Sequence, residues 1–427
     1  MDATSRGTSY VYGIERHTLC LASLAGDTAN NRFALGTLGI TEPGEIHLVD
    51  FKSDENILQS TVYKHSSGVR ALASTPWDPS RLVVVNCGSP SAKTTQPMVE
   101  LVALPDLPHH ALSDQEPAAE HETQRVAQLQ PAGTQITDPL HQAPPSPHSV
   151  VCHPTAHGKR AAVVSAANVV IWNLAQSPEP SSIFTVTAST QLMDDIEAAA
   201  WHPTNANQFS TTDSTCIRTW DTRTDAQKTH ETMTIECAHS AKVRALDYNP
   251  NLPYILASGG DDGSVRIWDT RNPTTALMEM DNHTHWVYGV EFNPNHDQLL
   301  LSAGSDGLVN LESAVSVSSA HVVAGIGSRS ASNTSRSYPS NSLDIAAAAA
   351  TETNNDKGTT KNSDNSDDED DTQKPTDGLV AQFDDHETSV YAAHWSAADP
   401  WIFASLSFDG RMVINLVPRE EKYKILL

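Results

Sequence analysis

The sequence is poor in cysteine and in basic residues, and each shortage excludes a class of protein. Its five cysteines are dispersed and form no CxxC motif, which argues against a disulfide framework and indicates reduced thiols in the cytosol or nucleus. The 27 lysine and arginine residues face 52 aspartate and glutamate residues, giving a net charge of −25. Because basic patches supply the affinity for nucleic acid and anionic lipid, neither is an expected partner.

Long apolar runs and catalytic signatures are also missing. No run approaches the roughly 18 apolar residues that a membrane span needs, so direct membrane insertion is not expected. The sequence begins without the charged and apolar regions of a secretory signal. It contains no P-loop, GxGxxG, HExxH or GxSxG motif. We therefore predict no catalytic residue, no cofactor and no metal site, and expect a protein that is not an enzyme.

What the sequence does contain is a repeat. Its clearest unit, LASGGDDGSVRIWDTR (Leu256–Arg271), joins an apolar run to an alternating strand through an Asp-Asp-Gly turn, the pattern of two strands of a β-propeller blade. The two Trp-Asp pairs, at Trp220 and Trp268, lie 48 residues apart, close to the roughly 40–45 expected of WD40 repeats. Candidate blades begin near residues 10, 63, 147, 190, 236, 282 and 382.

The repeat resembles the WD40 family and predicts an all-β fold, a seven-bladed WD40 β-propeller over residues 8–427. In that family a buried His, Ser/Thr, Asp and Trp network holds each blade together. In blade 5 the matching structural tetrad is His239, Ser258, Asp262 and Trp268. Blade 6 has Glu312 at the Trp position, and blade 7 has Asn415 there. We expect Lys422–Leu427 to complete blade 7, which would leave the N-terminus free.

Two segments interrupt the repeat. Residues 105–146 are rich in Pro, Gln, His and Ala, and residues 313–378 are rich in Ser, Ala and Asn and end in an acidic run. Such compositions do not bury a core, so both segments are predicted to be disordered insertions in blades 2 and 6. Within the acidic run, Ser366 has Glu369 three positions later, which makes Ser366 a candidate site for an acidophilic kinase.

One position in each inner strand is expected to face a partner. The residue that follows the first apolar residue of each inner strand should lie at the top rim of the central channel. The candidate partner-binding rim consists of Arg70, Glu197, Arg244, Tyr288 and Tyr391. Arg and Tyr anchor protein interfaces, so this rim is a candidate peptide-binding surface. The alternative is a rim that contacts only water.

Two Trp-Asp-Thr-Arg boxes favour a different partner. WD40 substrate receptors of cullin-RING ubiquitin ligases often carry such a box, and its arginine docks on the ligase adaptor. The candidate adaptor-binding residues are Trp220, Asp221, Arg223, Trp268, Asp269 and Arg271. The alternative is that arginine follows Trp-Asp in many ordinary blades.

A closer resemblance involves both ends of the chain. The stretch Val390–Leu427 is similar to the end of the EARP-and-GARP-complex-interacting WD-repeat family. Tyr12-Gly13, the motif from Ile46 to Phe51 and the loss of Trp-Asp at Glu312 also fit that family.

The resemblance implies a non-catalytic adaptor that binds a multisubunit vesicle-tethering complex. Such a protein would act in endosomal recycling and endosome-to-Golgi retrograde transport. It would be cytoplasmic and recruited peripherally, through the tether, to endosomes or the trans-Golgi network. A substrate receptor of a cullin-RING ligase is the second hypothesis, and a WD40-type peroxisomal import receptor is the third.

Overall fold

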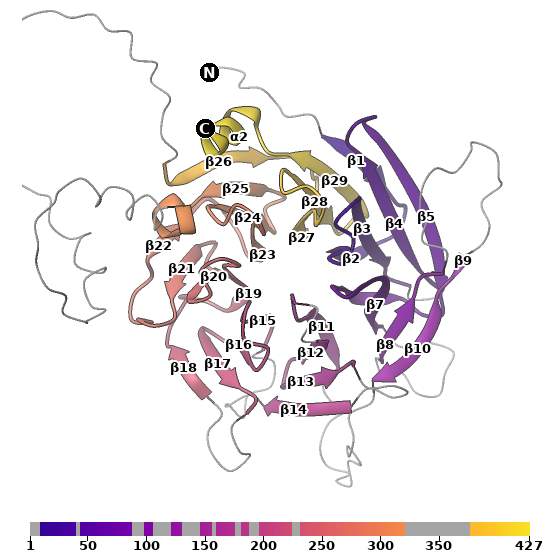
Figure 1. Cartoon of the computed structure of the whole chain (residues 1–427), viewed down its shortest axis with the longest axis horizontal. Helices are drawn as coiled ribbons and strands as arrows, with labels where there is room; N and C mark the ends of the chain where they lie inside the picture. The colour runs from indigo at the N-terminus through magenta and orange to yellow at the C-terminus, as the bar shows by residue number, and fades with distance from the viewer. Residues whose placement is uncertain are drawn as a thin grey trace, which may run out of the picture.

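In the computed structural model, seven β-sheets are arranged radially around a central axis (Figure 1). The structure describes residues 9–39, 43–87, 98–105, 121–129, 146–155, 159–175, 181–187, 196–223, 231–320 and 376–427. Nearly all elements in these ranges are strands, so the predicted seven-bladed β-propeller is confirmed. The exceptions are the 3₁₀ helix η1 (Val315–Val317) and the α-helix α2 (Arg419–Leu426).

The first three blades follow the chain in order. Blade 1 contains β2 (Thr18–Ser23), β3 (Asn31–Thr37), β4 (Gly44–Lys52), β5 (Ile57–His65) and β9 (His121–Glu122). Blade 2 contains β6 (Val69–Thr75), β7 (Asp78–Asn86), β8 (Val99–Ala103) and β10 (Gln124–Leu129). Blade 3 contains β11 (Pro147–Cys152), β12 (Arg160–Ser165), β13 (Asn168–Asn173) and β14 (Ser181–Thr187).

The remaining blades repeat this plan, and in each the first strand named lines the channel. Blade 4 contains β15 (Ala199–Trp201), β16 (Gln208–Asp213), β17 (Cys216–Asp221) and β18 (Glu231–Ile235). Blade 5 contains β19 (Val243–Tyr248), β20 (Ile255–Gly260), β21 (Val265–Asp269) and β22 (Met278–Met280). Blade 6 contains β23 (Val287–Phe292), β24 (Leu299–Gly304), β25 (Val309–Ser313) and β26 (Gly378–Phe383). Blade 7 contains β27 (Val390–Trp395), β28 (Ile402–Ser407), β29 (Arg411–Leu416) and β1 (Tyr10–Gly13).

The ring closes through the N-terminal strand, contrary to the prediction that Lys422–Leu427 completes blade 7. Strand β1 pairs antiparallel with β29, so the blade 1 that was expected to begin near residue 10 begins instead at Thr18. Residues 422–426 lie in helix α2, which follows its N-cap Pro418. The Arg, Glu, Lys and Leu residues of α2 favour a helix, whereas the Tyr-Val-Tyr alternation of β1 suits a strand.

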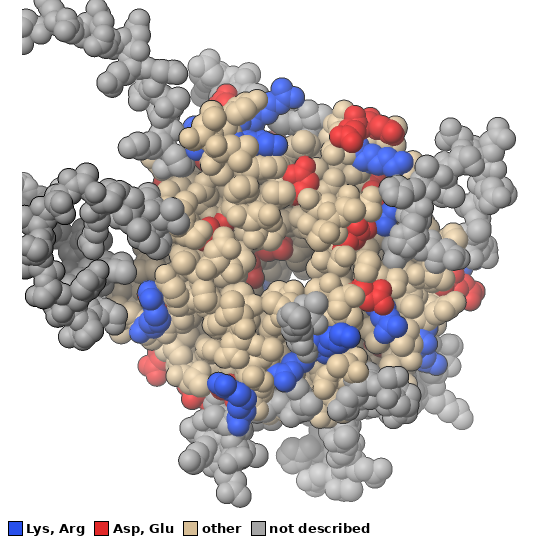
Figure 2. All heavy atoms as spheres, in the orientation of Figure 1, with Lys and Arg blue, Asp and Glu red and all other residues tan. Residues whose placement is uncertain are grey.

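Apolar clusters between neighbouring blades form the core. Phe33 and Leu35 of blade 1 share a buried cluster with Ile402 and Ile414 of blade 7, so the same interface that β1 closes is also sealed by packing. Removing this apolar area from water stabilises the ring by roughly 25 cal/mol per Å². Figure 2 shows one face of the ring, where acidic side chains lie at the margin of the central opening.

The predicted insertion boundaries are partly wrong. Residues 121–129, placed within the first insertion, form β9 and β10, and β10 pairs with β8 so that the buried Leu129 lies opposite Val99. An outer strand needs few apolar residues, because only part of it is covered, and its weak pattern was therefore missed. At the second insertion, Ser313 ends β25 and Gly378 begins β26. The rest of both predicted insertions, including Ser366, lies outside the described residues, apart from a few flanking positions.

Candidate functional site

The inner strands of six blades begin with the same irregularity. In β2, β6, β11, β19, β23 and β27 the pairing register shifts at the second residue of the strand. A β-bulge leaves one residue unpaired and re-aims its side chain. The bulged residues are Leu19, Arg70, His148, Arg244, Tyr288 and Tyr391.

Blade 4 reaches the same arrangement by another route. Glu197 precedes β15, and the amides of Glu197 and Ala198 donate to Oγ1 of Thr212 at 2.9 and 3.1 Å. The Thr212 hydroxyl thus takes the place of a backbone acceptor on the paired strand. It holds Glu197 at the position in blade 4 that corresponds to the bulged residues of the other six blades.

We call these seven residues the channel mouth. All seven line a central cavity of about 790 Å³. The structure therefore brings together the five predicted rim residues. It adds Leu19 and His148, which sequence reasoning missed because their strands begin with Thr18 and Pro147 rather than with an aliphatic residue. Both residues are found by taking the second position of each inner strand, whatever type of residue comes first.

Charged side chains occupy the part of the channel mouth contributed by blades 2 to 5. The Lys242 ammonium contacts Glu197, and Nη1 of Arg244 lies 3.8 Å from Oε1 of Glu197. Arg244 also donates from Nη2 to Oδ2 of Asp261 at 3.0 Å. Burial lowers the pKa of His148, whose Nε2 lies 3.1 Å from the carbonyl oxygen of Glu197. Arg70 is exposed and makes no hydrogen bond or ion pair with any residue that the structure describes.

Aromatic side chains occupy the part contributed by blades 5 to 7. The rings of Tyr288 and Tyr391 stack with centroids 4.5 Å apart and an interplanar angle of 21°. Burial, with the neighbouring Tyr391, raises the pKa of Tyr288 to about 12. The guanidinium carbon of Arg244 lies 4.7 Å from the ring centroid of Trp286, which is 38% exposed. Stacked rings beside a cation form the kind of surface that anchors a peptide.

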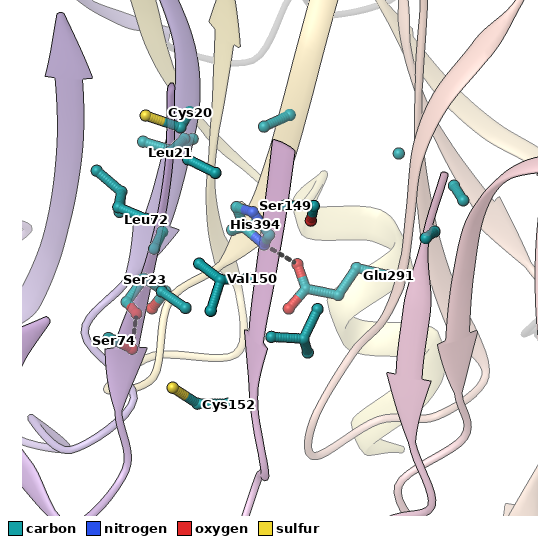
Figure 3. Close-up of a pocket in the computed structure, with 18 of the residues that line it drawn as sticks. Cys20, Leu21, Ser23, Leu72, Ser74, Ser149, Val150, Cys152, Glu291 and His394 are labelled. Carbon is teal, nitrogen blue, oxygen red and sulfur yellow. Dashed lines mark hydrogen bonds and ion pairs between the residues drawn. The ribbon is translucent and has the colours of Figure 1, made fainter. Parts of the chain in front are cut away.

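Below the mouth the cavity has two unlike walls (Figure 3). Leu21, Leu72 and Val150, from β2, β6 and β11, give one wall apolar side chains, and Ser23, Ser74 and Ser149 of the same strands add hydroxyl groups to it. Elsewhere Nδ1 of His394 and Oε2 of Glu291 point toward one another at 2.9 Å. Burial disfavours the protonated imidazole, but the Glu291 carboxylate outweighs that effect and raises the pKa of His394. This pair joins blades 6 and 7 and is an ion pair when His394 is protonated.

The four side chains of the blade 5 tetrad form one hydrogen-bonded chain. Nδ1 of His239 lies 2.9 Å from Oδ1 of Asp262, and Nε2 lies 2.7 Å from Oγ of Ser258. The indole of Trp268 donates to the same Oγ at 2.9 Å. Because a carboxylate only accepts, Nδ1 carries the hydrogen and Nε2 accepts from Ser258.

The tetrad also supports the channel mouth. Burial alone would raise the pKa of Asp262, but hydrogen bonds from His239, Ser240 and Ser264 hold it below its usual value. The adjoining Asp261, whose amide donates to the Lys242 carbonyl at 2.8 Å, is the carboxylate that binds Arg244. The turn fixed by the tetrad therefore positions Arg244.

The two Trp-Asp-Thr-Arg boxes lie away from the mouth, at the ends of β17 and β21. In an antiparallel blade the third strand ends on the face opposite to the start of the first strand. In each box the arginine amide donates to its own aspartate at 2.9 Å, and Nη2 lies 2.6 Å from Asp221 in one and 2.7 Å from Asp269 in the other. The side chains of Arg223 and Arg271 are 64% and 57% exposed.

Within the described ranges, the structure contains neither a cluster of metal-ligating side chains nor a membrane-spanning helix. Among them, no group of three or more His, Cys, Asp or Glu side chains is arranged to hold a metal ion. Within the same ranges, neither helix is long and apolar enough to cross a membrane.

A ring of seven β-sheets, with a complete His-Ser-Asp-Trp network in blade 5, defines a WD40 β-propeller, a class of scaffold that presents binding surfaces. The chain belongs to the family described as the EIPR1 beta-propeller, whose model matches residues 6–311. A WD domain, G-beta repeat model matches residues 378–414.

Relatives extend over nearly the whole chain. The chain is 32% identical to EARP and GARP complex-interacting protein 1 of Rattus norvegicus, with 98% of each protein covered. Identity to the Homo sapiens protein of the same name is 31%, again with 98% of each covered. Identity to EARP-interacting protein 1 of Caenorhabditis elegans is 29%, covering 97% of this chain and 98% of the relative. The family resemblance expected from the two ends of the sequence is confirmed.

Proposed function

We propose that this protein is a non-catalytic adaptor that binds a multisubunit vesicle-tethering complex of the EARP or GARP kind. The observation that carries the proposal is the match to relatives whose names state this interaction, at 31–32% identity over 98% of each chain. A match of that extent includes all seven blades rather than a single repeat. A rigid ring whose channel mouth carries charged and aromatic side chains suits a scaffold that holds partners.

We assign the tether contact to the channel mouth. Arg244, Tyr288 and Tyr391 offer a partner a guanidinium, stacked rings and the exposed Trp286 beside them. Arginine and aromatic residues dominate the binding energy of protein interfaces. Hydrogen bonds to Asp261 already hold Arg244 in place, so little side-chain entropy is lost when a partner binds.

In the cell, the protein would be cytoplasmic and would reach endosomes or the trans-Golgi network through the tether. It would support endosomal recycling and endosome-to-Golgi retrograde transport. The net charge of −25 disfavours direct attraction to anionic lipid, which supports indirect recruitment. Removal of a tether subunit should then disperse the protein from those membranes, as fluorescence microscopy of the tagged protein can measure.

Affinity purification of the tagged protein followed by mass spectrometry tests the proposal. Tether subunits should be enriched over a tag-only control, and their absence would refute the adaptor function. Arg244→Glu should reduce the recovery of tether subunits at least several-fold. Arg81→Glu is the matched control, because Arg81 is 42% exposed and pairs with Asp78 near the start of β7, away from the channel mouth. Equal recovery with Arg244→Glu and Arg81→Glu would move the contact away from the mouth.

A second candidate function is a substrate receptor of a cullin-RING ubiquitin ligase. It is favoured by one observation, that Arg223 and Arg271 are exposed in the same geometry on neighbouring blades. The same purification tests it. Recovery of a ligase adaptor that is lost in the Arg223→Ala, Arg271→Ala double variant would support this function over the first.

A further inference from the structure

We infer that the channel mouth takes an extended peptide segment in which a Glu or Asp side chain stands next to an apolar side chain. The carboxylate would bind Arg70, and the apolar side chain would enter the cavity beside blades 1 to 3. This inference rests on the proposed function, because it describes the tether segment that enters the site.

Among the described residues of the channel mouth, Arg70 is a cation whose charge remains available. Lys242 and Arg244 both contact Glu197, and Arg244 also holds Asp261. Arg70, by contrast, is exposed and has no hydrogen-bond or ion-pair partner in the part of the chain that the structure describes. In a protein with 52 acidic residues, an arginine left without a carboxylate at a cavity entrance indicates a site for an external one.

The backbone fixes Arg70 at this entrance. It is the bulged residue between Val69, which pairs with Asn86, and Ala71, which pairs with Val85. Val69 is fully buried, so the strand on which Arg70 stands is anchored in the core. The neighbouring mouth residue on blade 3, His148, stays neutral because burial lowers its pKa, so it does not repel Arg70.

The cavity wall below Arg70 sets the second requirement. Leu72, on the same strand, lies with Leu21 and Val150 along a wall made by β2, β6 and β11 (Figure 3). The volume of about 790 Å³ lies within the range of pockets that enclose small ligands or side chains. The Glu291 and His394 side chains satisfy one another, so they do not require a polar ligand group on that side.

The charges nearby favour a carboxylate over a phosphate. Arg70 carries one positive charge, so it neutralises a group of −1 charge but leaves a phosphate group of about −2 charge partly uncompensated. The stacked rings of Tyr288 and Tyr391 border the mouth on the other side and can cover the peptide backbone. An acidic residue beside an apolar one is therefore the chemistry that fits.

Peptide binding to the full-length protein tests the inference. Fluorescein-labelled nine-residue peptides would carry Glu-Leu, Gln-Leu, phosphoserine-Leu or Glu-Ser at the centre, and fluorescence anisotropy would give each Kd. We expect the Glu-Leu peptide to bind at least about tenfold more tightly than the Gln-Leu or Glu-Ser peptide. The Gln-Leu peptide lacks the charge that Arg70 binds, and the Glu-Ser peptide lacks the apolar side chain that enters the cavity. Equal binding of Glu-Leu and Gln-Leu, or tighter binding of phosphoserine-Leu, would overturn the carboxylate assignment. A peptide that binds only through a free C-terminal carboxylate, and not when amidated, would overturn it as well.

Variants connect this preference to Arg70. Arg70→Glu should weaken Glu-Leu binding at least about tenfold, Arg70→Lys should lose less, and Arg81→Glu on the same blade should bind like the wild type. Unchanged melting temperatures would show that each variant is folded. Unchanged Glu-Leu binding by Arg70→Glu would refute the site.

Tether capture separates this inference from the proposed function. If the wild type and Arg70→Glu recover equal amounts of tether subunits, the acidic-segment site is wrong and the adaptor function stands. If no tether is recovered but Glu-Leu binding depends on Arg70, the adaptor function is wrong, and the site is supported for a different partner.

Discussion

Blades 5 and 6 have the same histidine, serine and aspartate arrangement and differ at one buried position. Nε2 of the histidine lies 2.7 Å from Ser258 in blade 5 and 2.9 Å from Ser302 in blade 6. The residue of the third strand that pairs with a leucine of the second strand differs between the two blades. Trp268 faces Leu256 in blade 5, whereas Glu312 faces Leu300 in blade 6. Both side chains are buried.

This difference shows which part of the hydrogen-bond network a blade needs in order to form its sheet. Trp268 completes the hydrogen-bonded chain and also packs with Tyr248 and Ile235 in the cluster between blades 4 and 5. Glu312 accepts one hydrogen bond from Asn282 at 2.9 Å, while its Oε2 has no partner among the described residues. Blade 6 therefore keeps its sheet without the tryptophan and contains a buried carboxyl that destabilises it.

The blade with the incomplete network is also the one with the long insertion. After β25 in the chain, the amide of Ser316 donates to Oδ1 of Asp377 at 2.9 Å. The amide and the hydroxyl of Ser319 donate to the carboxylate of Asp297. The bond between Ser316 and Asp377 brings the two ends of the segment together, and the bonds to Asp297 fasten its first end to the loop before β24. Strand β26 can then pair with β25 whatever lies between them, since a longer loop adds little to the entropy of closure.

Trp268→Ala should have the largest effect of the changes that break this comparison. It removes a buried indole and leaves a cavity, which costs about 3–5 kcal/mol of unfolding free energy. Glu312→Ala at the matching position of blade 6 should cost far less, because it also removes a poorly solvated carboxyl. Urea unfolding of both variants, followed by tryptophan fluorescence and circular dichroism, measures the difference. Equal losses would show that the two positions have the same role.

His239→Ala should cause the next largest loss of stability. It leaves the Ser258 hydroxyl without its acceptor, whereas Asp262 keeps its hydrogen bonds from Ser240 and Ser264. A buried unsatisfied group costs about 1–3 kcal/mol. His283→Ala should lose less, because no tryptophan depends on Ser302. The two melting temperatures, measured by scanning calorimetry, would rank the blades, and a larger loss in blade 6 would contradict this account.

Glu312→Gln should stabilise the protein at neutral pH. Burial raises the pKa of Glu312 to about 6, above its usual value near 4.5, so the folded state favours the protonated carboxyl. The ionised form therefore destabilises the fold fully above about pH 6, and this effect disappears as the pH falls below 4.5. We expect a gain of about 1–2 kcal/mol at pH 7.5 and none at pH 4.5. Urea midpoints at the two pH values measure it, and a gain independent of pH would contradict the burial argument.

The repeat was predictable because a propeller applies the same constraints seven times. The spacing of His239, Asp262 and Trp268 identified one blade, and the offsets carried over to the others. Ring closure was not predictable from these offsets. Strand β1 has four residues and meets β29 across the whole chain, so no local pattern shows their pairing. Strand β10 was missed for a related reason, since an outer strand has only a weak apolar pattern.

The channel mouth was partly predictable. The offset from the apolar start of a strand placed Arg70 and Arg244 correctly at the cavity. It did not reveal that a bulge turns them there, or that Asp261 and Glu197 hold Arg244 whereas Arg70 has no hydrogen-bond or ion-pair partner among the described residues. Those differences depend on a turn of the same blade, at Asp261, and on the neighbouring blade 4, at Glu197, which only the folded ring brings together.

Arg271→Ala should have the smallest effect on stability, although Arg271 follows the tetrad tryptophan in sequence. Its pairing with Asp269 lies at the surface, and its guanidinium carbon lies 3.5 Å from the ring centroid of Tyr254. The side chain is 57% exposed, so solvent screens the ion pair, and we expect a loss below about 0.5 kcal/mol. Thermal unfolding at 50 mM and 500 mM NaCl measures this loss and its screening. A loss as large as that of His239→Ala would show that the box belongs to the interior network of blade 5 rather than to its surface.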